Sequence, residues 1–143
     1  MLTIRLSTTM TAAEIAPLWP GIVGCLEKYC RRFAEEESVA HILQQCAEGR
    51  RQLWIVTDES GRVILTPVTE IVTIDATGKK QLLLAEVGGE RLAECMPLLL
   101  HIEEWAAREH GATEAQLVGR KGWKRLMEPL GYRETAVIWR KGL

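Results

Sequence analysis

The feature that most constrains the fold is a strand, a long helix and a second strand in succession between residues 81 and 118. Residues 81–87 (QLLLAEV) form an apolar run, residues 90–110 place apolar side chains at helical spacing, and residues 114–118 (EAQLV) form a second short run. The helix must cross over the sheet, so the two strands are predicted to lie parallel and side by side. Their carboxyl ends and the start of the helix then meet at one edge, where an open α/β sheet usually binds its ligand.

Period and turn residues predict the remaining elements. Residues 2–6 alternate like a strand, and the clusters DESG (58–61) and DATG (75–78) separate the strands of an antiparallel meander. The meander strands are residues 53–57, 63–70 and 81–87. Helices are predicted at 12–33, with a break at Pro17 and Pro20, at 39–47 and at 122–130. A final strand is predicted at 132–140. This order predicts an α/β (α+β) fold with a mixed central sheet flanked by helices, in one domain of residues 1–143.

Charge and hydropathy exclude several classes of protein. Eighteen Lys and Arg against nineteen Asp and Glu give a net charge of -1, so no global field favours nucleic acid. The longest apolar runs, such as residues 96–100, are far shorter than the ~20 residues that cross a bilayer. The alternating start is unlike a signal peptide, so we expect a cytoplasmic protein.

The four cysteines have no paired close spacing, and reduced thiols are expected in such a protein. The one metal arrangement worth testing combines three of them with a histidine: Cys25, Cys30, His41 and Cys46. Its five-residue steps suit no standard zinc knuckle, so we predict no metal and interpret the cysteines as buried thiols on helices.

Three segments of the second half resemble the GNAT family of N-acetyltransferases: residues 99–112 (LLHIEEWAAREHGA), 115–118 (AQLV) and 123–132 (WKRLMEPLGY). The last matches the closing helix, Leu-Gly-aromatic and strand of that family. The resemblance implies a GNAT-like acyl-CoA N-acyltransferase fold, in which the pantetheine arm of acetyl-CoA inserts between two splayed parallel strands. It also implies an acyl-CoA and an amine substrate as ligands.

The phosphate-binding segment of that family falls on residues 87–96 (VGGERLAECM), which depart from its Arg/Gln-x-x-Gly-x-Gly/Ala pattern. In one interpretation Gly88 and Gly89 surround the pyrophosphate and Arg91 supplies the positive charge; in the other, Glu90 and Glu94 repel a phosphate. The cofactor-binding residues implied by the resemblance are Ala85, Val87, Gly88, Gly89, Arg91 and Ala93.

Glu86 and Glu70 are the candidate general bases, because each lies near the end of a central strand among apolar residues that raise a carboxyl pKa. The alternative is that either side chain points to solvent. The family often uses a Tyr four residues before the Leu-Gly-aromatic glycine as general acid, and that position is Met127. Tyr132 is interpreted as a core residue.

A basic cluster opens the last predicted helix: Arg120, Lys121, Lys124 and Arg125. We interpret it as a solvated helix face, with the adenosine-side phosphates of coenzyme A or an acidic partner as the alternative.

Three functions remain open. The first is an acetyl-CoA-dependent N-acetyltransferase that acts on a primary amine. The activity usual among proteins with this fold favours it. The second is a catalytically inactive GNAT-like binding or assembly module with a protein partner or a second copy of the chain, which Met127 and the altered phosphate segment favour. The third is an acyl-CoA sensor, which needs the pantetheine slot but no base.

Overall fold

The computed structural model describes residues 1–143. One five-stranded sheet forms its centre, and the strand order follows the chain: β1 (Thr3–Leu6), β2 (Gln52–Thr57), β3 (Val63–Thr73), β4 (Lys80–Gly89) and β5 (Glu114–Leu117). The first four strands pair antiparallel, whereas β4 and β5 pair parallel. The predicted mixed sheet and its parallel pair around a crossover helix are therefore confirmed.

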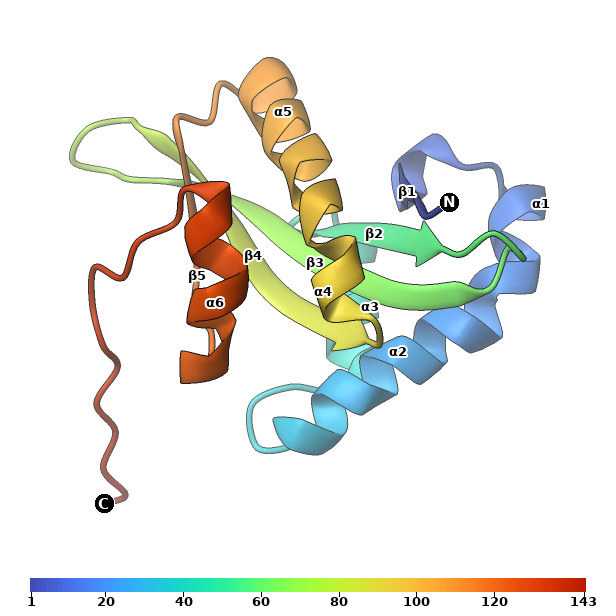
Figure 1. Cartoon of the computed structure of the whole chain (residues 1–143), viewed down its shortest axis with the longest axis horizontal. Coiled ribbons are helices and arrows are strands. Elements are labelled where there is room, and N and C mark those ends of the chain that lie inside the picture. Colours follow the sequence, from blue (N-terminus) through green and yellow to red (C-terminus); the bar gives the residue numbers. More distant parts are fainter.

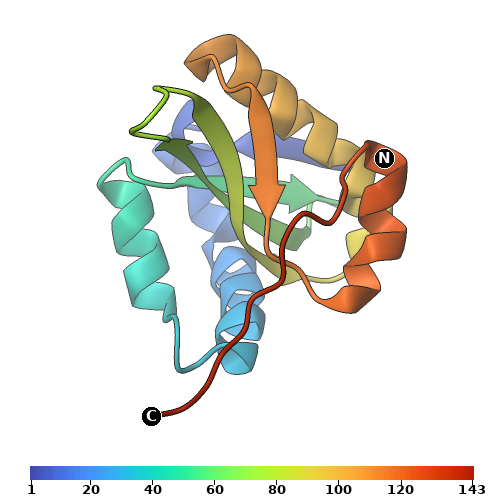
Figure 2. The same cartoon turned by 90° about the vertical axis from the view of Figure 1, so that its left-hand side faces the viewer.

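Helices cover both faces of this sheet (Figures 1 and 2). The short α1 (Ala12–Ile15) leads into α2 (Trp19–Arg32), which lies with α3 (Val39–Ala47) on one face. α4 (Leu92–Cys95), α5 (Leu99–His110) and α6 (Lys124–Met127) lie on the other face. No helix combines the length and the hydrophobicity that a membrane span requires.

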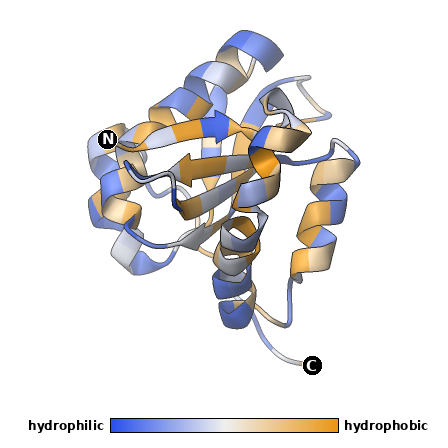
Figure 3. Ribbon diagram, turned by 90° about the vertical axis from the view of Figure 1, so that its right-hand side faces the viewer, coloured by the Kyte–Doolittle hydropathy of each residue, from blue (hydrophilic) through white to orange (hydrophobic).

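The strands divide the core into two layers because successive side chains point to opposite faces. Leu53 and Ile55 of β2 pack under α2 and α3, whereas Trp54 between them packs under α5. Hydrophobic residues accordingly dominate the central strands in Figure 3. The cluster under α5 and α6 contains Trp54, Leu82, Leu84, Leu99, Ile102 and Met127; the cluster under α2 and α3 contains Ile22, Leu26, Ile42, Leu53, Ile55 and Val68.

Local hydrogen bonds, a proline and a glycine mark the helix ends. Thr11 caps α1 in a capping box with Glu14, and the Ser38 hydroxyl accepts from the His41 amide at the start of α3. A 3-10 turn, Ala16–Leu18, contains Pro17 and separates α1 from α2, so the predicted break at the prolines is confirmed. Gly111 ends α5 in the left-handed conformation.

The predicted final strand over residues 132–140 is wrong. After Gly131 the chain is extended but pairs with no strand, and Val137, Ile138 and Trp139 are exposed. This last segment contacts the rest of the chain through, among others, an ion pair between Arg140 and Glu36. A period-two pattern reports strand propensity, but a strand forms only where a neighbouring edge offers hydrogen bonds, and β5 offers only four residues.

Candidate active site

A bulge in β4 changes the direction of its side chains at Ala85. Leu84 lies opposite Thr69 of β3 and Glu86 lies opposite Val68, so Ala85 has no partner between them. Leu84 therefore faces α5, whereas Glu86 shares the α2 face with Val68. If the same residues formed a regular strand without the bulge, Glu86 would share the face of Leu84 and point into the apolar core under α5.

At the same position β4 separates from β5. The parallel pairing extends from Gln81 and Glu114 to Leu84 and Leu117, and it ends there. β4 continues to Gly89, so its edge from Ala85 onward has no partner on the β5 side. Unpaired main-chain donors and acceptors along such an edge suit an extended ligand that carries amide groups.

Glu86 is buried, with only 6% of its side chain exposed. Its Oε1 accepts from Arg51 Nη1 at 2.5 Å, and its Oε2 has no hydrogen-bond partner. Burial raises the pKa of this carboxyl above its ordinary 4.5, although Arg51 acts in the opposite direction. A carboxylate in this state accepts a proton more readily than one in water, so Glu86 has the properties of a general base.

Arg51 joins Glu86 to two further carboxylates. Its Nη1 lies 3.5 Å from Glu37 Oε2 and its Nε lies 3.6 Å from Glu70 Oε2. Glu37 is 7% exposed and Glu70 is 30% exposed, so the group reaches the surface at Glu70. Glu70 therefore lies in the same cluster as Glu86, and neither points freely into solvent.

Gly88 and Gly89 both have packing reasons to be glycine. A Cβ at Gly88 would lie 2.1 Å from the Cys25 carbonyl oxygen of α2. Gly89 has φ +134, and a Cβ there would lie 2.2 Å from the Ile64 carbonyl oxygen. The two glycines allow β3, β4 and α2 to approach closely, and a role in binding phosphate is not needed to explain them.

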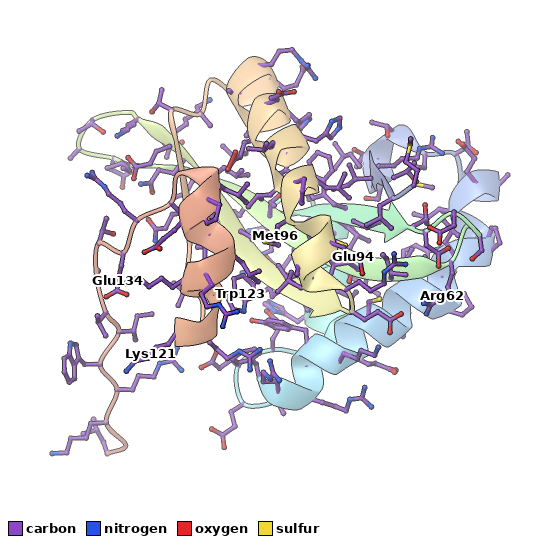
Figure 4. The ribbon with its side chains drawn as sticks, viewed as in Figure 1. Arg62, Glu94, Met96, Lys121, Trp123 and Glu134 are labelled. Carbon is purple, nitrogen blue, oxygen red and sulfur yellow. The ribbon has the colours of Figure 1, made fainter.

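The two acidic residues beside them are paired. Glu90 accepts from Arg62 at 2.6 Å and lies 3.6 Å from Lys28, and these partners lower its pKa. Arg91 holds Glu94 with two hydrogen bonds, at 3.1 and 2.7 Å, and lowers its pKa. Arg62 and Glu94 lie on the same side of the molecule, near the start of α4 (Figure 4). Arg62 also lies 3.6 Å from Asp58, so three cations stand against three carboxylates, and Ala93 is exposed beside them.

No family model matches the sequence, and no curated protein matches it. Solved acetyltransferases match the structure over nearly the whole of both chains. A Trypanosoma brucei acetyltransferase superposes with a TM-score of 0.67 at 14% identity, covering 100% of each chain. A glucosamine-6-phosphate N-acetyltransferase from Arabidopsis thaliana gives 0.69 at 12% identity, covering 99% of this chain and 98% of its own. An aminoglycoside acetyltransferase from a soil metagenome gives 0.70 at 11% identity, covering 100% and 99%.

The chain has the GNAT fold. In this GNAT fold, Met127 is the last residue of α6 and is buried in the core cluster under α5, so the position where the family often places a Tyr has no proton to donate. The Tyr132 hydroxyl donates to Glu103 Oε1 at 2.5 Å, and its ring packs against the α5 cluster. Trp123, labelled beside α6 in Figure 4, packs against the same cluster. The basic residues Arg120, Lys121, Lys124 and Arg125 are all exposed.

Four residues of the site were missed in the sequence: Lys28, Glu37, Arg51 and Arg62. Glu37 belongs to the acidic group 35–37, which lies just before the start of α3. Its Oε1 does accept from the Ser38 amide there, while its Oε2 faces Arg51. Arg51 follows the turn at Gly49, and only the pairing of β2 with β3 brings it near Glu86.

Proposed function

We propose that this chain is an acetyl-CoA-dependent N-acetyltransferase that transfers an acyl group to a primary amine. The observation that supports it most is the position of Glu86, a buried carboxylate with a free oxygen one residue beyond the bulge at Ala85. The unpaired edge of β4 begins at the same place. A base therefore lies beside the main-chain groups that would align a thioester.

In the proposed reaction, Glu86 is the general base. Glu86 Oε2 takes a proton from the ammonium of the acceptor, and the free amine then attacks the thioester carbonyl carbon. The carbon–sulfur bond breaks, an amide forms, and the thiolate leaves with the second proton of the attacking nitrogen. Met127 has no proton to donate, so no side chain at that position takes part.

The β4 edge and the start of α4 would hold the cofactor. The main chain of Ala85 and Val87 would bind the pantetheine amides along the unpaired edge. Arg91, together with Lys28 and Arg62, would supply positive charge to the pyrophosphate, with Ala93 leaving room beside it. Gly88 and Gly89 keep this segment close to α2 and β3.

Thiol release from acetyl-CoA in the presence of a panel of primary amines tests this function. Glu86→Gln removes the base and keeps the shape, so we expect kcat/KM to fall by about a hundredfold or more. Glu104→Gln, an exposed change on α5, is the matched control and leaves the rate unchanged. Equal rates for the two variants would exclude Glu86 as the base.

The second candidate is an inactive GNAT-like binding or assembly module. Two observations favour it: the buried Met127 at the general-acid position, and the engagement of Arg91 by Glu94. It predicts no thiol release with any amine in the panel.

A further inference from the structure

The unpartnered oxygen of Glu86 points to a missing donor. Glu86 Oε2 is buried and accepts no hydrogen bond, while Oε1 is held by Arg51. A buried acceptor without a partner is costly, and native proteins rarely keep one unless a ligand or water completes it. The ammonium group of an amine substrate carries only hydrogen-bond donors, so it can donate to this free oxygen.

The charges around this oxygen are also unbalanced. Glu37, Glu70 and Glu86 lie within 3.6 Å of one guanidinium, that of Arg51. Glu37 has one further partner, His41 Nδ1 at 2.5 Å, which adds charge only when it is protonated. Three carboxylates therefore share a single permanent cation, and the cluster has capacity for more positive charge.

Arg51 combines a fixed backbone with a long side chain that has several rotatable bonds. Its main-chain amide and that of Arg50 both donate to the Gln45 carbonyl, so the backbone is fixed. The Arg51 side chain is 20% exposed, and its guanidinium lies beside Glu70, the most exposed carboxylate of the three. A cationic ligand that enters at Glu70 can replace this guanidinium without any change in the sheet.

The geometry points to a dication site in which Glu37, Glu70 and Glu86 recognise an acceptor that carries two positively charged amines. One ammonium lies on Glu86 Oε2 beside the bulge, and the second takes the place of the Arg51 guanidinium on Glu70 and Glu37. The identification of the dication as the acceptor rests on the proposed function, whereas its binding does not.

Calorimetric titration without any acyl-CoA tests the site directly. We expect 1,4-diaminobutane to bind about tenfold more tightly than n-pentylamine, its monoamine match in length, and 4-aminobutanoate not to bind. Glu70→Gln is expected to remove most of the difference between the two amines. Glu104→Gln on α5 is the control and keeps it. Equal affinity for the diamine and the monoamine in the unmodified protein would overturn the site.

A second variant tests the dication site with all three carboxylates in place. Arg51→Gln removes the internal cation, so the diamine is expected to raise the melting temperature of this variant more than that of the unmodified protein. An equal or smaller shift in the variant would show that the diamine does not take the place of Arg51.

Acetyl-CoA titration separates the two proposals. Diamine binding without acetyl-CoA binding would retain the dication site and reject the acetyltransferase. Turnover of acetyl-CoA with equal kcat/KM for 1,4-diaminobutane and n-pentylamine would retain the acetyltransferase and reject the dication site.

Discussion

Arg51 Nη1 lies 2.5 Å from Glu86 Oε1, although the two residues are 35 positions apart and belong to different ends of the meander. The pairing of β2 with β3, and of β3 with β4 through the bulge at Ala85, brings them together. This contact fixes one oxygen of Glu86 and leaves the other free. The proposed chemistry depends on that free oxygen.

The pKa of Glu86 predicts how its replacement changes the pH dependence of stability. Burial raises this pKa above 4.5 in the native state, so the native protein binds the proton more tightly than the unfolded chain does. The stability contributed by Glu86 is therefore fully present below about pH 4.5 and is lost as the pH rises through the raised pKa. Glu86→Gln cannot titrate.

We thus expect the unmodified protein to lose stability relative to Glu86→Gln as the pH rises from about 4.5. Melting temperatures of both proteins over a pH series measure the difference, and the carboxyls outside the Arg51 cluster cancel in the comparison. If the unmodified protein instead gained stability relative to Glu86→Gln as the pH rose, the effect of Arg51 on the Glu86 pKa would outweigh that of burial. Glu86 would then be an ordinary ion-paired carboxylate.

Gly88→Ala tests whether this glycine serves packing. The added methyl would meet the Cys25 carbonyl of α2, so we expect a loss of about 3 kcal/mol or more in the free energy of unfolding. Gly24→Ala on α2 is the control, because a Cβ at Gly24 meets nothing within 4 Å. This change should stabilise the protein by about 1 kcal/mol or less. Urea denaturation measures both. A mild effect of Gly88→Ala on stability with loss of acetyl-CoA binding would instead favour a role in the ligand site.

Tyr132→Phe separates a structural tyrosine from a catalytic one. Burial raises the Tyr132 pKa and the hydrogen bond to Glu103 raises it further, so this hydroxyl is a poor acid. We expect a loss of about 1–2 kcal/mol in stability and no change in kcat. Glu103→Gln keeps an acceptor and should cost less. A large fall in kcat with unchanged stability would make Tyr132 the missing proton donor.

Removal of residues 133–143 tests the description of the last segment. These residues are exposed and pair with no strand, and the Arg140–Glu36 ion pair lies at the surface. We therefore expect truncation to change stability by about 0.5 kcal/mol or less, as measured by urea denaturation. A loss of several kcal/mol would show that the segment pairs with a sheet edge in solution.

The sequence was sufficient to predict the central part of the fold. The strand, helix and strand between residues 81 and 118 required a parallel pair, which the structure confirms. Local rules sufficed there because the signals are periodic and the connections are short. The final strand failed because its formation depends on a partner edge and not on its own residues.

The site was harder to predict than the fold. Glu86 was identified from its position near a strand end, but the bulge that turns it toward α2 leaves no mark in the sequence around Ala85. Arg51 reaches the site through the pairing of strands, and Glu37 reaches it through the path of the loop before α3. Neither arrangement follows from local sequence. One interpretation of the sequence placed Gly88 and Gly89 in phosphate binding; their close packing against α2 and β3 cannot be seen in one strand alone.

Calorimetric titration with acetyl-CoA, and with coenzyme A for comparison, tests the central claim most directly. We predict micromolar binding of both ligands, with a matching rise in melting temperature. Arg91→Gln should weaken this binding, whereas Arg108→Gln, an exposed change at the end of α5, should not. Absence of heat and of any melting shift at millimolar ligand would contradict the acetyltransferase proposal and leave a GNAT fold that serves another purpose.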